Sequence, residues 1–446
     1  MISSLDITNS YLVARSAIDA GARRAAKVAL ADGLGVMVAA TGLEPAVKPF
    51  MAHAAALGQG AATLIGQGAT ASPVAAALAN GALAHALDFE DTFERGKIHP
   101  NAALIPAVLA LAESENACGD DLLAAMVLGC DFACRLSLAL DGDPAQRGWY
   151  HPPILSGLGA TLGCCTLLAL DAEATVSALG LFLAQFLLSD DLKRSPRSHL
   201  RAVREGFGAR AAVEAALLAR AGVLAVDQPL EGQSGLFALL TGKPPRADAF
   251  EAIGQRFHGP DVGIKRWPSC RGTHTAVLAA CALRNRGIVS SDIEAVSVEV
   301  GPPNDMLFVP RAQRIEPQTA IDAKFSIPFV FASALETGDL TLASFAPDRL
   351  RRSSTLALAA RVSMADTPAP DGTEATYTVE VRGGGSVREV VDTVPVWRTG
   401  DLSPADLSPK LGVCLRASMR RPDLPAFLSA VAGLESQAIS SLTRLL

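Results

Sequence analysis

The chain has 446 residues, half of them hydrophobic and only 19% charged, so we expect a large buried core divided among one to three domains. The net charge of −6 and the lack of long basic runs argue against a nucleic-acid partner. Eight cysteines without CxxC spacing, and a beginning without a basic-then-apolar signal, predict a reduced, cytoplasmic protein.

A membrane partner is not expected either. Residues 152–170 form a charge-free run of about the length that spans a bilayer. The run contains Pro, Ser, Thr and three glycines, and Trp and Tyr are too rare in the chain to form interfacial belts. We therefore predict buried helices that approach closely through small residues, in a protein whose apolar excess favours a homo-oligomer.

Helical spacing covers almost the whole chain up to about residue 265. The expected helices are residues 10–31, 45–56, 72–87, 101–113, 120–140, 156–170, 174–189 and 202–220. Glycines and prolines interrupt them, and no repeat of 30 to 45 residues is visible.

Beyond residue 265 the pattern changes. Helices are expected at residues 275–286 and 325–335, and helix returns after residue 403. Strands are expected at residues 293–300, 355–362 and 373–394, the last a hairpin that turns at Gly383, Gly384 and Gly385. The predicted fold is mainly α, with a large all-helical domain (1–265 and 397–446) and a smaller α+β lid (266–396). A cleft between two such domains is a common ligand site.

The stretch at residues 71–112 carries an unusual group of charges. Asp88, Glu90, Asp91 and Thr92 form an acidic segment between two apolar helices, and His99 precedes the proline that opens the second helix. Buried polar groups without partners cost several kcal/mol, so this segment is either fully hydrogen-bonded or in contact with a ligand, and we predict the ligand.

A metal-dependent alternative is weaker. Asp88 and Asp91 are three residues apart with Glu90 between them, which is typical of acidic helix ends that hold Mg²⁺ for diphosphate substrates. The chain lacks a convincing second acidic motif on a facing helix. We therefore predict no metal and no cofactor.

Five blocks, in this order, resemble the MmgE/PrpD family, which includes 2-methylcitrate dehydratase, cis-aconitate decarboxylase and iminodisuccinate epimerase. The blocks are NGALAHALDFEDT (80–92) followed by HP (99–100), HPP (151–153), GFGARAAVEAALLARAG (206–222), KRWPSCRGTH (265–274) and FSIPFVFASALETGDLTLASF (325–345). The resemblance implies a helical domain with an α+β lid, a soluble homodimer, and action on small di- or tricarboxylates without an organic cofactor.

The resemblance also implies site residues. Positions that match functional positions of the family are Asp88, Thr92, His99, His151, Lys265 and His274. The chain departs from the family at Arg210, where relatives carry lysine in the third block, and at Phe329, where the decarboxylase carries tyrosine in the fifth.

The chemistry of the family gives these residues their expected roles. Its reactions break a C–H or C–C bond at the carbon α to a carboxylate, so fixed positive charge must stabilise the enolate that forms. The candidate cations are Lys265, Arg210, Arg266 and Arg271.

The candidate bases are His99 and His151, since each precedes a proline that opens a buried helix, with His274 as a further cleft residue. Asp88 would orient a histidine or Lys265, and Tyr150 would donate a proton. Thr92 would bind substrate. His85 is interpreted as structural.

Four functions remain open, three of them catalytic. Epimerisation of a small polycarboxylate, similar to that of iminodisuccinate, is favoured because the two departures from the family pattern disfavour simple dehydration or decarboxylation. Dehydration of the 2-methylcitrate type and decarboxylation of the cis-aconitate type are the alternatives. A non-catalytic binding protein that keeps the fold is the remaining hypothesis.

Overall fold

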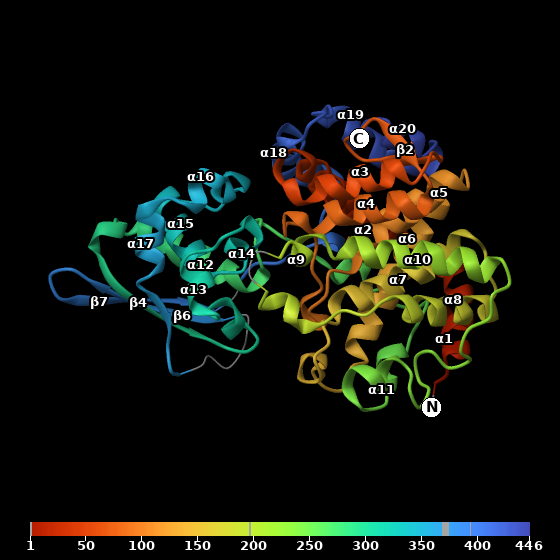
Figure 1. Cartoon of the computed structure of the whole chain (residues 1–446), viewed down its shortest axis with the longest axis horizontal. Coiled ribbons are helices and arrows are strands. Elements are labelled where there is room, and N and C mark those ends of the chain that lie inside the picture. The colour runs from red at the N-terminus through yellow and green to blue at the C-terminus, as the bar shows by residue number, and fades with distance from the viewer. Residues whose placement is uncertain (1, 196–197, 368–373, 393) are drawn as a thin grey trace.

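The computed structural model describes residues 2–195, 198–367, 374–392 and 394–446. Helices dominate these residues, and the sheets are small. Figure 1 shows a large helical lobe, which contains segments from both ends of the chain, and a smaller lobe in which helices accompany a sheet. The predicted fold class, mainly α with a smaller α+β part, is confirmed.

The large lobe is a bundle in which helix α7 packs against α5, α6 and α10. Its helices are α1 (Ser4–Ala14), α2 (Ala20–Leu43), α3 (Lys48–Ala56), α4 (Pro73–Ala86), α5 (Pro100–Ser114), α6 (Gly119–Leu138), α7 (Pro152–Leu167), α8 (Ala172–Gln185), α9 (Leu200–Val203), α10 (Glu205–Arg220), α11 (Leu236–Thr241), α18 (Ser408–Ala417), α19 (Leu424–Ala432) and α20 (Ser440–Thr443). The last three return to the bundle, where α18 and α19 pack against α2.

Small residues allow these helices to touch backbone to backbone. A Cβ atom built on Gly129 of α6 would lie 2.6 Å from the carbonyl oxygen of Gly159 on α7. One built on Gly81 of α4 would lie 2.6 Å from the Cα of Gly206 on α10. Both distances are far below van der Waals contact, so a larger side chain at either crossing would push the helices apart.

The apolar run at residues 152–170 is the buried helix α7, as predicted. Among the residues described, α2 is the helix long and apolar enough to cross a membrane, and 78% of its apolar window is buried inside the protein. Its apolar composition is therefore accounted for by packing within the bundle.

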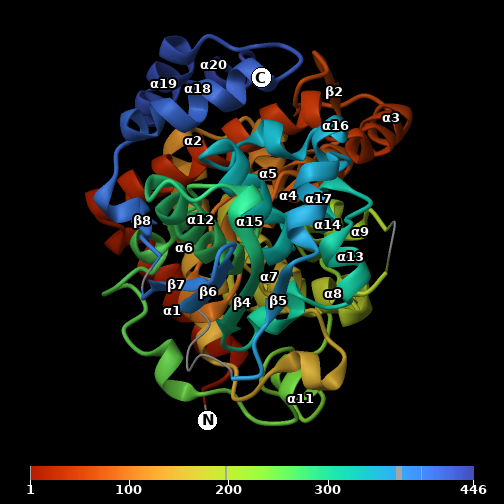
Figure 2. The same cartoon turned by 90° about the vertical axis from the view of Figure 1, so that its left-hand side faces the viewer.

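The small lobe contains a four-stranded sheet in the order β5-β4-β6-β7, with β4 and β5 parallel and the other pairs antiparallel. Figure 2 turns this lobe toward the viewer and shows the strands in that order. The elements are α12 (His274–Asn285), β4 (Ile293–Val300), α13 (Arg311–Ile315), α14 (Ala320–Lys324), α15 (Ile327–Thr337), α16 (Pro347–Leu350), α17 (Ser353–Ala359), β5 (Val362–Met364), β6 (Ala375–Val381) and β7 (Gly385–Val391).

The two stretches that connect the lobes pair with each other. Strand β3 (Gly263–Ile264) is antiparallel to β8 (Trp397–Arg398). This pair lies at the limits predicted for the lid, although those limits remain a prediction. Because both connections are joined, the residues that follow β3 are held close to the helical lobe.

Several predicted elements differ from the observed ones. The helix expected at residues 10–31 is two helices, because the Asp19 side chain accepts a hydrogen bond from the backbone N–H of Ala22 and begins α2 separately. The predicted strand at residues 355–362 is wrong, since most of it is helix α17, and only Val362 belongs to a strand. A short apolar run of this kind is compatible with both the helical period of 3.6 residues and the strand period of 2 residues.

The described residues contain two β-hairpins, of which the sequence predicted one. The hairpin predicted at residues 373–394 is confirmed as β6 and β7, with Gly383 and Gly384 at φ of 93° and 84° in the turn, a backbone conformation that glycine adopts without strain. Residues 373 and 393 lie outside the described residues. A second hairpin, β1 (Ala62–Leu64) with β2 (Ala69–Ala71), was not predicted and interrupts the region expected to be entirely helical.

Candidate active site

The acidic segment that follows α4 is buried and pinned to the strand that leads into the small lobe. Asp88 has a φ of 49°, a left-handed conformation uncommon outside glycine, and its side chain is fully buried. Thr92 exchanges two backbone hydrogen bonds with Gly263, at 2.8 and 2.7 Å. This pairing explains how Lys265, distant in sequence, reaches the acidic segment.

Lys265 forms a buried ion pair with Asp88. Its Nζ donates to Asp88 Oδ1 at 2.5 Å and to the Asp88 carbonyl oxygen at 3.2 Å, and lies 3.5 Å from Glu90 Oε1. Burial alone would lower the pKa of Lys265, but the Asp88 and Glu90 carboxylates outweigh burial and raise it. Burial would likewise raise the pKa of Asp88, but Lys265 and then His85 bring it below its usual value. Lys265 is therefore a permanent buried cation.

His99 occupies the N-cap of α5, as predicted, with its side chain 16% exposed. Its Nδ1 lies 2.7 Å from the carbonyl oxygen of Asp91, which can only accept, so Nδ1 carries the proton and Nε2 has a free lone pair. Burial, followed by the charge of Lys265, lowers the pKa of His99 to about 3. The ring is therefore neutral and held in one tautomer, with Nε2 as the basic atom.

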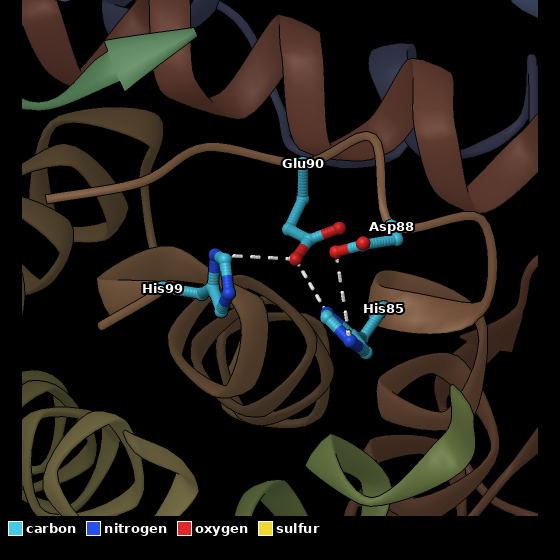
Figure 3. A group of neighbouring side chains, drawn as sticks. All are labelled: His85, Asp88, Glu90 and His99. Atoms are coloured by element: carbon cyan, nitrogen blue, oxygen red, sulfur yellow. Dashed lines mark hydrogen bonds and ion pairs between the residues drawn. The ribbon is translucent and has the colours of Figure 1, made fainter. Parts of the chain in front are cut away.

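Glu90 links the two histidines of this region. Its Oε1 lies 2.5 Å from Nδ1 of His85 and 3.3 Å from Nδ1 of His99. Figure 3 shows Glu90 in contact with both rings. His85 is fully buried, and burial lowers the pKa of its ring well below the usual value. His85 is not part of the cavity lining described below, which agrees with its structural interpretation.

The same four side chains contain donors that divalent metals bind. The ligand atoms of His85, Asp88, Glu90 and His99 lie within 4.8 Å of one another. The Lys265 ammonium, however, already contacts two of these carboxylates and supplies the compensating charge. The 2.5 Å contact between His85 and Glu90 is a hydrogen-bond distance, shorter than the spacing of two ligands on one metal. The arrangement therefore suits an ammonium better than a metal ion.

A cavity of about 260 Å³ brings most of the predicted site residues together. Its lining comes from both lobes. The predicted residues on it are Asp88, Thr92, His99, Tyr150, His151, Lys265 and Arg271. The candidate bases and the buried lysine thus face one space, as the predicted cleft requires.

His151 marks another part of this cavity. It is the N-cap of α7, and burial lowers the pKa of its ring to about 4, so it too is neutral. Lys97, Asp143 and Lys193 line the cavity with it. Sequence reasoning missed these three residues. Lys97 and Asp143 are exposed beside short 3-10 turns and Lys193 ends another, so only the position of Lys97 next to the acidic segment offered a signal.

Tyr150 lines the cavity and contacts two cations. Its ring centroid is 5.2 Å from Nζ of Lys193 and 5.0 Å from Cζ of Arg204. Its backbone N–H donates to the carbonyl oxygen of Leu188 at 2.9 Å, which holds it beside His151.

Three predicted binding residues do not line the cavity. Arg210 lies on α10 with its Nε unpaired, away from the lining. Arg266 is exposed, and its guanidinium lies over the Trp267 and Trp397 rings, 5.0 and 5.7 Å from their centroids. His274 is buried behind Arg271, with Nδ1 at 3.5 Å from its guanidinium. The structure thus gives His274 a positioning contact rather than a lining one.

Two buried arginines were also missed. Arg201 and Arg204 are each less than 5% exposed, and Nε and Nη2 of both lack hydrogen-bond partners, although Arg204 Nε lies 3.2 Å from Glu205 Oε1 in a buried ion pair. The Arg201 guanidinium lies 3.3 Å from the ring centroid of Phe325, which lines the cavity. Their spacing of three residues, just before the third block, was the available signal. Arg201 therefore places positive charge directly behind the cavity wall, whereas the charge of Arg204 is shared with Glu205.

The chain belongs to the MmgE/PrpD family. The MmgE/PrpD N-terminal domain matches residues 11–248 and the C-terminal domain matches residues 267–421, so the predicted family is confirmed. Lys265 lies between the two matched segments.

The curated relatives are similar at low identity. A cis-aconitate decarboxylase-like protein of Aspergillus oryzae is 25% identical over 315 residues, covering 66% of this chain and 64% of the relative. Human cis-aconitate decarboxylase is 25% identical over 304 residues, with 66% and 61% covered. The mouse cis-aconitate decarboxylase is 25% identical over 395 residues, with 84% and 78% covered. The match spans less than two thirds of the first two relatives. These names support a lyase family, and none of them names an epimerase.

Proposed function

We propose that the protein is an enzyme that breaks a bond at the carbon α to a carboxylate of a small di- or tricarboxylate. The observation that carries this proposal is the joint placement of His99, His151 and Lys265 on one cavity. A neutral imidazole with a free Nε2 can accept a proton, and a buried ammonium can stabilise the enolate.

The low pKa of His99, about 3, describes the protein without substrate. A bound polycarboxylate brings negative charge next to the ring and raises its pKa, because an anion favours the imidazolium. His99 thus becomes a stronger base only when substrate is present. Lys97 on the lining supplies charge that attracts such an anion, together with Lys265, Arg271 and Lys193, which are also paired with Asp88, Glu94 and Asp190.

Epimerisation is the finer proposal. It needs two bases, one for each face of the reacting carbon, and His99 and His151 are two neutral imidazoles on the same cavity. Decarboxylation is the second candidate and is supported by the names of the relatives. It requires loss of CO₂ and a single protonation, which one histidine and Lys265 can serve.

The test uses candidate polycarboxylates in deuterated water. Deuterium entering inverted diacid without an alkene signal supports epimerisation, whereas CO₂ release with a new alkene supports decarboxylation, and an alkene without CO₂ indicates dehydration. His99→Gln and Lys265→Met are expected to abolish turnover. His53→Gln, at an exposed position on α3, is the matched control and should keep full activity.

Two results would overturn the proposal. If the His99 and Lys265 variants turn over every substrate normally, the cavity is not the reaction site and the binding-protein hypothesis gains support. If EDTA abolishes activity and Mg²⁺ restores it, the metal-dependent alternative applies.

A further inference from the structure

The wall of the substrate cavity contains a salt bridge between the two lobes. Glu94 begins a short 3-10 turn (Glu94–Gly96) of the helical lobe, and Arg271 begins another (Arg271–Thr273) in the small lobe. Both residues line the cavity, with side chains 28% and 19% exposed, and Nε of Arg271 donates to Oε1 of Glu94. The salt bridge therefore faces the space that the substrate enters.

The protein itself contacts all three nitrogens of the Arg271 guanidinium. Besides the bond from Nε to Glu94, Nη2 donates to the carbonyl oxygen of Val394 at 2.7 Å, and Nη1 lies 3.5 Å from Nδ1 of His274. Arginine binds a carboxylate most strongly through two parallel N–H groups. A substrate carboxylate that takes this geometry must displace Glu94 or another of these partners, so Arg271 is an occupied anion site.

The other cations on the lining differ in how far they are neutralised. Nζ of Lys265 is paired with Asp88, and Nζ of Lys193 lies 2.5 Å from Oδ1 of Asp190. Among the described residues of the lining, Lys97 is the cation that has no carboxylate partner. Lys97 is therefore the positive charge that this lining offers to a ligand without breaking an ion pair.

The lining as a whole is only weakly positive. Its four cations face three carboxylates, because Asp143 adds a negative charge to those of Asp88 and Glu94. His99 and His151 add no charge at neutral pH, since burial lowers their pKa values to about 3 and about 4. The charge of the cavity thus suits a ligand with few negative groups.

A second cation without a carboxylate partner lies directly behind the wall. Arg201 has Nε and Nη2 unpaired, and its guanidinium lies 3.3 Å from the ring centroid of Phe325 on the lining. Lys97 and Arg201 together balance the two charges of a dicarboxylate. A third carboxylate would meet the negative charge of Glu94 while Arg271 is already occupied, and like charges repel strongly in a partly buried site.

We propose that Glu94 is a specificity-determining residue, which keeps Arg271 in the salt bridge and thereby selects dicarboxylates over tricarboxylates. This proposal rests on the proposed function, because it needs the cavity to bind a polycarboxylate, and it narrows the substrate class to dicarboxylates. Specificity often comes from a repulsive group placed against the unwanted ligand. Glu94 supplies that repulsion and withholds the Arg271 guanidinium from a third carboxylate.

The test compares glutarate with tricarballylate, which is glutarate with one carboxylate added to its central carbon. Isothermal titration calorimetry measures the Kd of each probe at fixed ionic strength and at a pH above the pKa values of all their carboxyl groups. The wild type should bind glutarate more tightly. Glu94→Gln keeps the size of the side chain and an acceptor for Arg271 but removes the negative charge. The ratio of the two Kd values should therefore shift toward tricarballylate on the order of tenfold.

Two further variants show whether the shift comes from Arg271. Glu115→Gln, the matched control, removes a partly exposed carboxylate that is paired with Arg220 at 2.8 Å and does not line the cavity, so the Kd ratio should stay at the wild-type value. The double variant Glu94→Gln/Arg271→Gln should lose most of the shift, because the released guanidinium is gone. Thermal unfolding of each variant confirms that it is folded.

Different results would overturn this proposal and the proposed function. A Kd ratio in Glu94→Gln equal to that of the wild type, or a full shift in the double variant, removes the role of Glu94 and leaves the proposed function standing. Tighter binding of tricarballylate than of glutarate by the wild type does the same. If neither probe binds to the wild type or to Glu94→Gln, the cavity is not a polycarboxylate site, and the proposed function fails together with this proposal.

Discussion

The Lys265–Asp88 pair allows the sharpest test of the site, because its removal has a calculable cost. Both side chains are at most 1% exposed, and Nζ contacts Asp88 Oδ1 at 2.5 Å. Lys265→Met leaves the Asp88 and Glu90 carboxylates buried without their cation. Removing one partner of a buried ion pair costs about 3–5 kcal/mol of stability.

The double variant Lys265→Met/Asp88→Asn separates pairing from function. It leaves neither side of the ion pair alone, so we expect it to recover about 2 kcal/mol relative to the sum of the single changes, as coupled neighbours do. Activity should remain absent, because the cation that stabilises the enolate is missing. Urea denaturation at neutral pH and turnover of the active substrate measure the two effects.

Lys243→Met provides the matched control. Lys243 pairs with Asp141 at 3.2 Å, but both side chains are more than half exposed, so its loss should cost less than about 1 kcal/mol. Two results would refute the reasoning from a buried charged pair. One is a loss of unfolding free energy in Lys265→Met as small as that of the control, and the other is a loss in the double variant equal to the sum of those in Lys265→Met and Asp88→Asn.

The remaining predictions concern pH, a buried arginine and helix packing. Folded Asp91 keeps a proton up to a pKa of about 7, whereas the unfolded chain releases it near 3.8, so this group makes wild-type stability fall as pH rises between those values. Asp91→Asn should therefore gain stability relative to wild type over that window, by at most about 4 kcal/mol, and a pH-independent difference in urea midpoints would disprove it. Arg201→Met should keep or raise thermal stability, because it removes an unpaired buried charge, and should weaken kcat/KM for polycarboxylates; lower stability with unchanged kinetics would contradict this. Gly206→Val should cost about 1–3 kcal/mol, because a Cβ there lies 2.4 Å from the Leu78 carbonyl oxygen, and an unchanged Tm would exclude the close contact of α4 with α10.

Local features of the sequence were sufficient for much of the fold. His99 and His151 were predicted at helix starts because each precedes a proline, and both are N-caps. Strand β4 and the glycine hairpin followed from alternation and turn residues, which act over a few neighbouring positions. The strand expected at residues 355–362 was wrong because no local signal decides the structure there. A short apolar run is compatible with a helix and with a strand, and tertiary packing selects the helix α17.

The predicted homodimer, the cytoplasmic location and the absence of a cofactor remain predictions, since they concern molecules and surroundings beyond the single chain.

The sequence identified some site residues, but it did not show which of the candidate cations reach the cavity. Charge and residue type identified Lys265, Arg271, Arg210 and Arg266 as candidate cations, with Lys265 favoured and Arg266 ranked last. Only Lys265 and Arg271 reach the cavity.

Amino-acid order alone therefore determined the helical class, the family and the histidines that begin buried helices, because those signals are local or are carried by contiguous blocks. The tertiary structure alone decided which cations are buried together. The pairing of Thr92 with Gly263 sets Lys265 against Asp88, and the α9 turn buries Arg201 behind Phe325. Such contacts join residues more than a hundred positions apart, and their energies depend on burial that no local pattern specifies.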